Sequence, residues 1–522
     1  MEPYDPSETI ATIPSRWRSA LAGLLAAGVA LASGELVAGL SDSLASPVIS
    51  VGNQVVDAVP RQVKDFAIET FGTNDKKALL LGIYTVAALI GLIIGIVASR
   101  RFILGALGIV AFGAVGVWAA GNEVGAPWWA GLPSVIGTIL AVGVLAALIT
   151  TIPPAKAAPT YPGSVAMARR SFLQVSLGVT VVAIGAATTG RWLQGRFSAA
   201  ASRLAVVLPK PKEPLAPVAA GVDLALAGMT PYVTPNSAFY RIDTNLTVPQ
   251  IAAEDWTLKV KGMVDRELEF TYQDILDMPM IERRITMTCV SDEIGGGLVG
   301  NAAWLGTPLR PILEQAGVSK GADQIVGRAF DGFTTGWPVK HLTDGREPLL
   351  VVGMNGEPLP LAHGFPARII VPGLYGFVSA TKWLTEIELT TFADFDQYWV
   401  KRDWSAEGPI KTMARIDTPK GLGRVKPGKV AIGGVAWAQT RGIAKVEVRI
   451  DDGAWKPAKL AKQDNDQTWR QWVYDWDADE GRHTVTARAT DTTGKVQTED
   501  RARPFPNGAS GWHNIVVLCQ PA

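Results

Sequence analysis

The chain has 522 residues, a formal net charge of +1, four histidines and two cysteines. This length allows several domains, and the near-zero net charge without a basic run gives no sign of a nucleic-acid partner. Two cysteines are too few for an iron–sulfur cluster held by protein thiolates. Charged side chains make up only 19% of the residues and are unevenly distributed, which indicates a membrane-attached protein.

Five stretches within residues 1–195 are long and apolar enough to cross a hydrocarbon core of about 30 Å. The first, residues 20–40, contains a single charged side chain, Glu35, and the other four contain none. These four are residues 78–98, 102–121, 131–152 and 171–190. We therefore expect an N-terminal bundle of about five transmembrane helices.

Two features near the first span have alternative interpretations. Glu35 is either a proton or ion site inside the membrane or, as its place near the end of the span favours, a carboxylate at the interface. Residues 48–71 place Val51, Val55, Val59 and Val63 at four-residue spacing, which predicts a helix lying on the membrane surface. An ordinary amphipathic packing helix is the alternative, and Pro60 weakens both.

Basic residues orient the predicted bundle. Arg16 and Arg18 precede the first span, Arg100 and Arg101 join two spans, and Lys156, Arg169 and Arg170 precede the fifth. The positive-inside rule places these segments in the cytoplasm. An odd number of spans then places everything after about residue 195 outside, so we expect a multi-pass membrane protein with extracytoplasmic domains.

Three further regions follow the predicted bundle. Residues 196–235 are rich in proline and predict an extended linker. Residues 236–410 alternate short strands with helix-like pieces, which is typical of an α+β domain. Residues 411–522 contain alternating or β-branched segments at 430–437, 446–450, 469–476 and 483–489, and they predict an immunoglobulin-like β-sandwich.

Cys289 is the most informative residue of the α+β region. It follows the apolar strand expected at 284–287 and precedes Gly295, Gly296 and Gly297, which allow backbone to approach a bulky group. A lone thiol is usually an inert core residue, as Cys519 in its apolar strand is expected to be. The thiol of Cys289, however, stands at a strand end beside an open loop, where a soft metal ligand is expected.

Four motifs around Cys289 occur in a fixed order, at residues 234–249, 285–297, 354–368 and 372–384. Together they resemble the molybdopterin domain of the sulfite oxidase family, a resemblance that covers about 170 residues. It implies that Cys289 ligates molybdenum and that the C-terminal sandwich belongs to a type often used for dimerisation, so a homodimer is possible. The cofactor implied is molybdenum with molybdopterin.

The resemblance also implies which residues bind the cofactor. Arg368 and His363 match the family closely, and Asp331 and Lys382 match it less closely because the loop lengths differ. The full set of cofactor-binding candidates is Tyr240, Arg241, Asn245, Asp331, His363, Arg368, Ser379 and Lys382. For each of them the alternative role is an ordinary surface salt bridge or packing.

The chain departs from the family where the anionic substrate would bind. Arginines that follow the metal cysteine in sulfite oxidases are replaced by Glu293 and Ile294, and a substrate-site tyrosine is replaced by Trp404. Arg441 remains as a candidate anion-binding residue, with a structural role equally possible. We therefore list Cys289, Trp404 and Arg441 as catalytic candidates and expect sulfite to be a poor substrate. An aromatic pocket of Trp304, Trp404 and Tyr398 would suit a neutral S-oxide or N-oxide better.

Further expectations concern export and electron transfer. Residues 168–174 resemble a twin-arginine export signal, which carries folded, cofactor-loaded domains; a simple topology anchor is the alternative. All four histidines follow residue 340 and there is no Cys-x-x-Cys-His motif, so we expect no haem in this chain. Electrons would pass to a separate carrier, such as a haem protein or a quinone-linked subunit. The other readings are a sulfite dehydrogenase proper, a channel or transporter, and a cofactor-free membrane scaffold or adhesion module.

Overall fold

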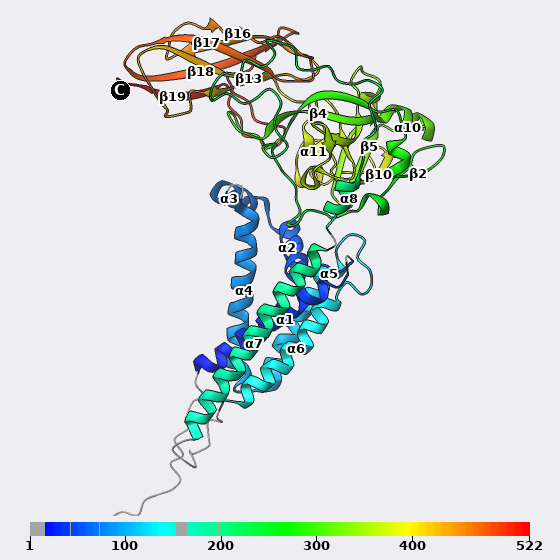
Figure 1. The fold of residues 1–522 in the computed structure, drawn as a ribbon, viewed down its shortest axis with the longest axis vertical. Helices are drawn as coiled ribbons and strands as arrows, with labels where there is room; N and C mark the ends of the chain where they lie inside the picture. The colour runs from blue at the N-terminus through cyan, green and yellow to red at the C-terminus, as the bar shows by residue number, and fades with distance from the viewer. Residues whose placement is uncertain (1–15, 42, 72–73, 153–163, 197, 522) are drawn as a thin grey trace, which may run out of the picture. The chain divides into compact units, whose positions relative to one another are not determined.

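A computed structural model describes residues 16–41, 43–71, 74–152, 164–196 and 198–521. The chain divides into two compact units (Figure 1). The helical unit comprises Met1–Ser198 with Thr244–Thr247, and the β-rich unit comprises Ala199–Asp243 with Val248–Ala522.

Five helices of the helical unit are long and apolar enough to cross a membrane, as expected. They are α1 (Arg16–Ala38), α4 (Asp75–Ala98), α5 (Phe102–Gly121), α6 (Leu132–Thr150) and α7 (Ser164–Gly195), the candidate span in α7 beginning at Arg170. Lys156 and the side chain of Arg169, on which the topology and export predictions partly rest, lie outside the described residues.

Helix α1 contacts α4, α6 and α7. Glycines make the α1–α4 contact possible, because a Cβ atom on Gly95 would lie only 2.0 Å from the carbonyl oxygen of Ser19 and one on Gly23 only 2.1 Å from that of Gly91. Small residues at such crossings let two helix backbones approach closely inside a membrane.

The carboxylate of Glu35 is buried in the helical unit near the end of α1, with 7% of the residue exposed. Ser46 donates a hydrogen bond to Oε1, and Nε2 of Gln194 on α7 donates to Oε2 at 3.1 Å. Polar groups of this kind join helices where no water is available to pair them.

The single helix expected at 48–71 is instead two helices, α2 (Pro47–Ala58) and α3 (Arg61–Phe71). The break falls at Pro60, which cannot donate the backbone hydrogen bond that a continuous helix needs. Helix α2 buries Pro47, Val48, Ser50 and Gly52 and contacts α5. Val63, on α3, is therefore separated from the three valines with which it was grouped.

The β-rich unit begins with residues 199–243, which contain little regular secondary structure. This segment nevertheless packs within the unit, because Tyr232 is only 1% exposed and its hydroxyl hydrogen bonds with Asp464 and Thr468, both at 3.0 Å. A short helix, α8 (Ala200–Ala205), lies at its start.

Two sheets build the α+β part of this unit. One has the order β2-β1-β10-β5-β6, with the parallel pair β1 and β10 inside it. Its strands are Leu268–Thr271, Thr257–Gly262, Leu384–Thr390, Gln324–Ala329 and Thr334–Pro338. The other sheet runs β3-β4-β7-β8, with β9 also paired to β7. Its strands are Ile281–Thr288, Val299–Pro308, Leu349–Met354, Glu357–Pro358 and, for β9, Arg368–Ile370.

Three short helices join these strands: α9 (Tyr272–Leu276), α10 (Leu309–Ala316) and α11 (Gly376–Ser379). Helix α9 starts with a capping box in which Thr271 and Asp274 satisfy each other's backbone N–H groups. Helix α10 turns Leu309, Ile312 and Leu313 into the core, as their helical spacing predicts.

Residues after 411 form two further sheets around their own apolar core (Figure 1). The first has the order β11-β13-β17-β16, with strands Met413–Thr418, Gly428–Trp437, Arg470–Ala478 and Lys459–Leu460. The second has the order β12-β19-β18-β14-β15, with strands Arg424–Val425, His513–Cys519, Gly481–Asp491, Ile443–Ile450 and Lys456–Pro457. The four segments expected to be strands are all strands, and Cys519 is fully buried in β19.

Candidate molybdenum cofactor site

Cys289 follows β3 directly and is 8% exposed. Its backbone N–H donates to the carbonyl of Leu298 at 2.9 Å, which closes residues 289–298 into a loop that we call the cysteine loop. The Sγ atom lies 3.0 Å from the hydroxyl oxygen of Ser291. Burial raises the pKa of the Cys289 thiol, while the hydrogen bond from Ser291 lowers it. A positive partner would therefore be needed to hold the thiolate form.

The C-terminal sheets hold the cysteine loop from one side. Arg415, on β11, donates from Nη1 to the carbonyl of Gly296 at 2.9 Å and from Nε to Asp417 at 2.7 Å. The ring of His513 occupies the space beside Gly295, where a Cβ atom would lie 2.2 Å from Nε2. Gly295 also has a φ of +78°, a conformation that glycine adopts at little cost.

Arg368 lies on β9 and is 4% exposed. Its Nη1 donates to the carbonyl of His363 at 3.0 Å, and its guanidinium lies over the Trp304 ring at 5.4 Å from the centroid. Burial lowers the pKa of Arg368 to about 10. Among the residues that the structure describes, none hydrogen bonds with Nε and none forms an ion pair with this guanidinium.

His363 stands five residues before Arg368 and is also buried. Burial, followed by the charge of Arg368, lowers its pKa to about 4, so the ring is neutral near pH 7. Nε2 lies 3.3 Å from the backbone carbonyl of Asn236, and this nitrogen must carry the proton because a carbonyl can only accept. Nδ1 therefore keeps its lone pair and can accept a hydrogen bond.

Lys382 supplies a second cation, which is half-buried. Its Nζ donates to Asp243 Oδ2 at 3.1 Å and lies 4.3 Å from the centroid of the Trp383 ring. Burial lowers the pKa of Lys382 to about 8, against the opposite effect of Asp243. Arg241 also pairs with Asp243, at 2.7 Å, so the two cations share one carboxylate.

Asp331 belongs to the same electrostatic neighbourhood. Its Oδ1 accepts from the backbone N–H of Phe333 at 3.0 Å. Burial raises the pKa of Asp331, and the nearby charge of Lys382 lowers it. The structure therefore places Asp331 within electrostatic reach of Lys382.

Two tyrosines and an aspartate lie within electrostatic reach of the Cys289 thiol. Burial raises the pKa of Tyr240, and the charge of Cys289 raises it further, while Arg368 lowers it. Burial raises the pKa of Tyr375 to about 12, with added contributions from Asp292 and Cys289. Sequence reasoning missed Tyr375 and Asp292, although both stand inside the motifs that carried the resemblance.

Asp292 is a buried carboxyl of the cysteine loop. Its Oδ1 accepts from the backbone N–H of Leu298 at 2.8 Å. Burial raises its pKa to about 6, against the stabilising hydrogen bond from Leu298 and the charge of Arg415. The carboxyl therefore holds the far end of the loop to its beginning.

Ser379 is buried in α11, and its hydroxyl donates to backbone carbonyls of Leu374 and Tyr375 at 3.2 and 3.0 Å. The hydroxyl proton is thus used within the protein. A ligand could therefore bind only to backbone groups around Ser379.

Asn245 belongs to the segment Thr244–Thr247 of the helical unit, where Lys76 donates to its backbone carbonyl. Asn245 and Cys289 therefore belong to different units.

Arg441 is engaged within the protein. Its Nε donates to the fully buried side chain of Asp491 at 2.9 Å, and Nη2 donates to the Ile410 carbonyl at 3.1 Å. Much of its positive charge is therefore compensated. Its charge still lowers the pKa of Tyr375, so it lies within electrostatic reach of the residues near the thiol.

The three rings expected to form an aromatic pocket belong to two clusters. Trp404 contacts Phe377, Trp399 and Phe505, with centroid separations of 5.9, 5.8 and 5.3 Å. Tyr398 also contacts Trp399, at 5.1 Å. Trp304 instead is fully buried against Phe239 and donates from Nε1 to the Ile285 carbonyl at 3.1 Å. Trp304 is therefore a core residue beneath Arg368.

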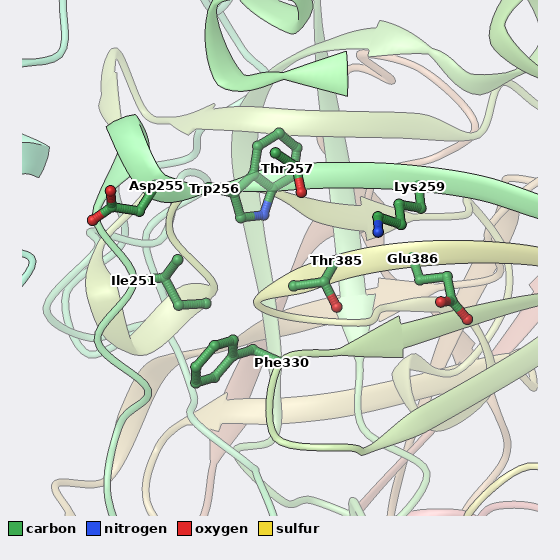
Figure 2. Close-up of a pocket in the computed structure, with 8 residues that line it drawn as sticks. All are labelled: Ile251, Asp255, Trp256, Thr257, Lys259, Phe330, Thr385 and Glu386. Atoms are coloured by element: carbon green, nitrogen blue, oxygen red, sulfur yellow. The ribbon is translucent and has the colours of Figure 1, made fainter. Parts of the chain in front are cut away.

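A separate pocket of about 310 Å³ opens beside β1 and β10 (Figure 2). Lys259 and Glu386 lie toward one side of it, and Asp255, Ile251 and Phe330 lie toward the other. None of the predicted site residues lines this pocket. It is distinct from the surroundings of Cys289.

The donor set fits a molybdenum pterin. In the described part of the chain, no group of three or more His, Cys, Asp or Glu side chains is arranged to hold a metal. A metal at Cys289 would therefore take its other ligands from a bound group. Burying Nε of Arg368 without a hydrogen-bond acceptor costs folding free energy. An anionic or acceptor-rich ligand bound beside it would supply the missing acceptor.

Comparisons with known proteins agree with this geometry. The family described as "Oxidoreductase molybdopterin binding domain" matches residues 245–399. Mitochondrial sulfite oxidase of Homo sapiens is 26% identical over 343 residues, which cover 56% of this chain and 62% of that protein. Sulfite oxidase of Arabidopsis thaliana is 27% identical over 349 residues, covering 55% of this chain and 88% of that protein.

The fold has a solved counterpart in the sulfane dehydrogenase SoxCD from Paracoccus pantotrophus. That structure covers 57% of this chain with a TM-score of 0.50, and 85% of its own chain is covered. Its sequence is 22% identical, so the likeness shows the fold alone.

The fold and the donor set around Cys289 define a molybdopterin-binding oxidoreductase domain. The relatives make the resemblance more specific: residues 245–399 match the molybdopterin-binding domain family, and over slightly more than half of its length the chain is similar to sulfite oxidases. The chain nevertheless spans only 62% of the length of human sulfite oxidase.

Proposed function

We propose that the protein is a membrane-anchored molybdenum oxidoreductase that transfers an oxygen atom to or from a small extracytoplasmic molecule. Electrons are exchanged with a separate membrane or periplasmic carrier. The observation that carries the proposal is the grouping of a buried thiol, Cys289, with the buried Arg368 and the half-buried Lys382, whose charges act on one another.

Seven side chains and the backbone around Ser379 would hold the cofactor. Cys289 is the protein ligand of molybdenum, and Arg368 and Lys382 hold the negative charge of the pterin phosphate. Neutral His363 accepts a hydrogen bond through Nδ1, and Asp331 accepts from ring N–H groups. Tyr240, Arg241 and the backbone around Ser379 complete the cradle. When bound, the cofactor supplies a metal that changes oxidation state by two electrons and carries an exchangeable oxygen.

The substrate proposed is a neutral or organic S-oxide or N-oxide. Glu293 and Ile294 follow the metal cysteine where sulfite oxidases have arginine, and Asp292 adds a second carboxyl beside the thiol. Arg441 is compensated by Asp491. Removal of positive charge and addition of carboxylates weaken the binding of a dianion such as sulfite by Coulomb repulsion alone.

A sulfite dehydrogenase is the second candidate, because the relatives named above are sulfite oxidases. Steady-state assays with a dye electron carrier separate the two candidates. Turnover of S-oxides or N-oxides with weak sulfite turnover supports the first. Efficient sulfite oxidation that is lost in Cys289→Ala establishes the second.

Membrane placement is also proposed. Five helices of sufficient length and apolarity, with basic residues at alternate ends, support a multi-pass anchor with the β-rich unit outside. The motif at 168–174 supports twin-arginine export of the loaded domain. Replacing Arg169 and Arg170 by lysine keeps the charge; normal appearance of the cofactor-loaded unit outside the membrane would contradict this export route.

The two C-terminal sheets are further proposed to form an immunoglobulin-like sandwich that pairs with a second copy of the chain. Their separate apolar core and strand order support the sandwich. Light scattering of the purified protein in detergent tests the homodimer, with a monomeric mass as the contradicting result.

Metal analysis tests the central claim. Purified full-length protein should contain about one molybdenum per chain, and Cys289→Ala should lose the metal or all turnover. A matched control is Cys519→Ala, which removes the second thiol from a buried strand and should keep both. A properly exported protein without molybdenum would favour a scaffold or adhesion module instead.

A further inference from the structure

Helix α3 carries an apolar stripe that the rest of the described helical unit leaves exposed. Val63, Phe66 and Phe71 are 52%, 62% and 45% exposed. At 100° per residue these positions fall within one arc of the helix surface, and Ala67 and Thr70 lie between them. Arg61, Asp65 and Glu69 follow one another at four-residue spacing on the other side of the helical wheel.

The neighbours of α3 fix where this stripe can lie. Helix α3 ends at Phe71 and α4 begins at Asp75, and three intervening residues span about 10 Å at most. The apolar part of α4 begins directly after Lys76 and Lys77. If α4 crosses a bilayer, as the proposed function holds, its first turn lies at the depth of the lipid headgroups. The short connection then keeps the C-terminal end of α3 at about the same depth.

The N-terminal end of α3 is also connected to the bundle by a short segment. Helix α2 ends at Ala58, only a few residues before Arg61, and contacts both α4 and α5. A helix held at both ends beside the bundle, with an exposed apolar stripe, matches an interfacial amphipathic helix.

We propose that α3 lies in the membrane interface with Val63, Phe66 and Phe71 inserted among lipid chains and the opposite side of the helical wheel toward water. This inference rests on the membrane anchoring proposed above. The helix contains two basic and two acidic residues, so its formal charges cancel and apolar burial drives the contact. Binding should therefore depend little on the fraction of anionic lipid.

Site-directed spin labelling of the full chain in lipid nanodiscs tests the proposal. Both native cysteines are buried, and the unsubstituted protein serves as the labelling blank. Labels are placed through Phe66→Cys on the apolar stripe and Asp65→Cys on the polar side. Accessibility is measured to oxygen, which concentrates in lipid, and to a water-soluble nickel chelate.

A higher ratio of oxygen to nickel accessibility at position 66 than at 65, unchanged between phosphatidylcholine and mixed phosphatidylcholine–phosphatidylglycerol nanodiscs, is the expected result. Equal ratios at both positions would place the stripe in water, and low accessibility to both reagents at 66 would place it against protein. Either outcome overturns the proposal.

A label at Leu107→Cys, an exposed position of α5 (56%), distinguishes failure of the proposal for α3 from failure of the proposal that the helical bundle spans the membrane. Lipid-like accessibility at 107 without it at 66 rejects only the role of α3. Water-like accessibility at 107 rejects the membrane-spanning bundle, and the role of α3 with it.

Discussion

Arg415 Nη1 donates to the carbonyl oxygen of Gly296 at 2.9 Å, and this hydrogen bond joins the C-terminal sheets to the cysteine loop. The same guanidinium binds Asp417 at 2.7 Å and the Thr230 hydroxyl at 2.8 Å. A planar fork that contacts three segments fixes their relative positions more tightly than a point charge can.

Arg415→Lys should therefore loosen the cysteine loop while keeping the charge beside Asp417. We expect a loss of about 1–3 kcal/mol in unfolding free energy, the usual range when buried hydrogen-bond partners are lost, together with reduced molybdenum content. Arg470→Lys is the matched control, because Arg470 donates to the Ala461 and Ile443 carbonyls within the C-terminal sheets and not to the loop. Equal molybdenum loss in both variants would show a general effect of domain stability.

Arg368→Met should separate cofactor binding from stability. Arg368 is buried without an ion-pair partner among the described residues, so replacing it with an apolar chain should leave the unfolding free energy of the cofactor-free protein within about 1 kcal/mol or raise it. Cofactor content should fall sharply.

The control for that experiment is Arg284→Met. Arg284 is equally buried but pairs with the half-buried Asp464 at 2.7 Å, so its loss should cost about 1–3 kcal/mol by leaving that carboxylate with the Tyr232 hydroxyl but without its cationic partner. Retained molybdenum in Arg368→Met would contradict the role assigned to this residue.

His513 should make stability depend on acid pH. Burial lowers its folded pKa to about 4 from an ordinary value of 6.5. Between these values the unfolded chain binds more protons than the folded one, so stability rises with pH through this window and is lost as pH falls from about 6.5 to 4. The full effect is up to about 3 kcal/mol at 1.36 kcal/mol per pH unit.

Denaturant titrations of the wild type and His513→Asn at several pH values measure this effect. In the wild type, the Ile416 N–H donates to Nδ1 of His513 at 2.9 Å. The Oδ1 atom of an asparagine at this position can accept the same hydrogen bond, and the asparagine side chain does not titrate. Asp292, with a raised pKa of about 6, contributes the opposite slope, so the difference between the two proteins is the informative quantity. A difference that is flat between pH 4 and 6.5 would refute the prediction.

Glu35→Leu should destabilise the helical unit by about 1–2 kcal/mol, because the donors of Ser46 and Gln194 lose their acceptor inside the bundle. Glu35→Gln keeps an acceptor oxygen and should lose less. Thermal unfolding midpoints in detergent compare the two variants. Equal midpoints for both and for the wild type would mean that the polar cluster adds no stability.

Much of the fold was predictable because its signals are local. Apolar runs of about 20 residues identified the long helices, and the alternation at 430–437 and 483–489 identified strands β13 and β18. The helix expected across 48–71 was wrong at Pro60, where proline's missing N–H outweighed the four-residue spacing of valines.

The sequence alone singled out Cys289 as the proposed metal-binding thiol and His363 and Arg368 as proposed cofactor-binding residues, because these residue types occur in motifs that can be read in order along the chain. Only the tertiary structure decided which charged side chains are paired within the protein and which could interact with a ligand. It compensates Arg441 with Asp491, 50 positions later in the chain, and leaves the guanidinium of Arg368 without an ion pair in the described residues. It also brings Arg415 to Gly296 from 119 residues away. Charge pairing and burial depend on distances in space, and no local pattern in the sequence encodes them.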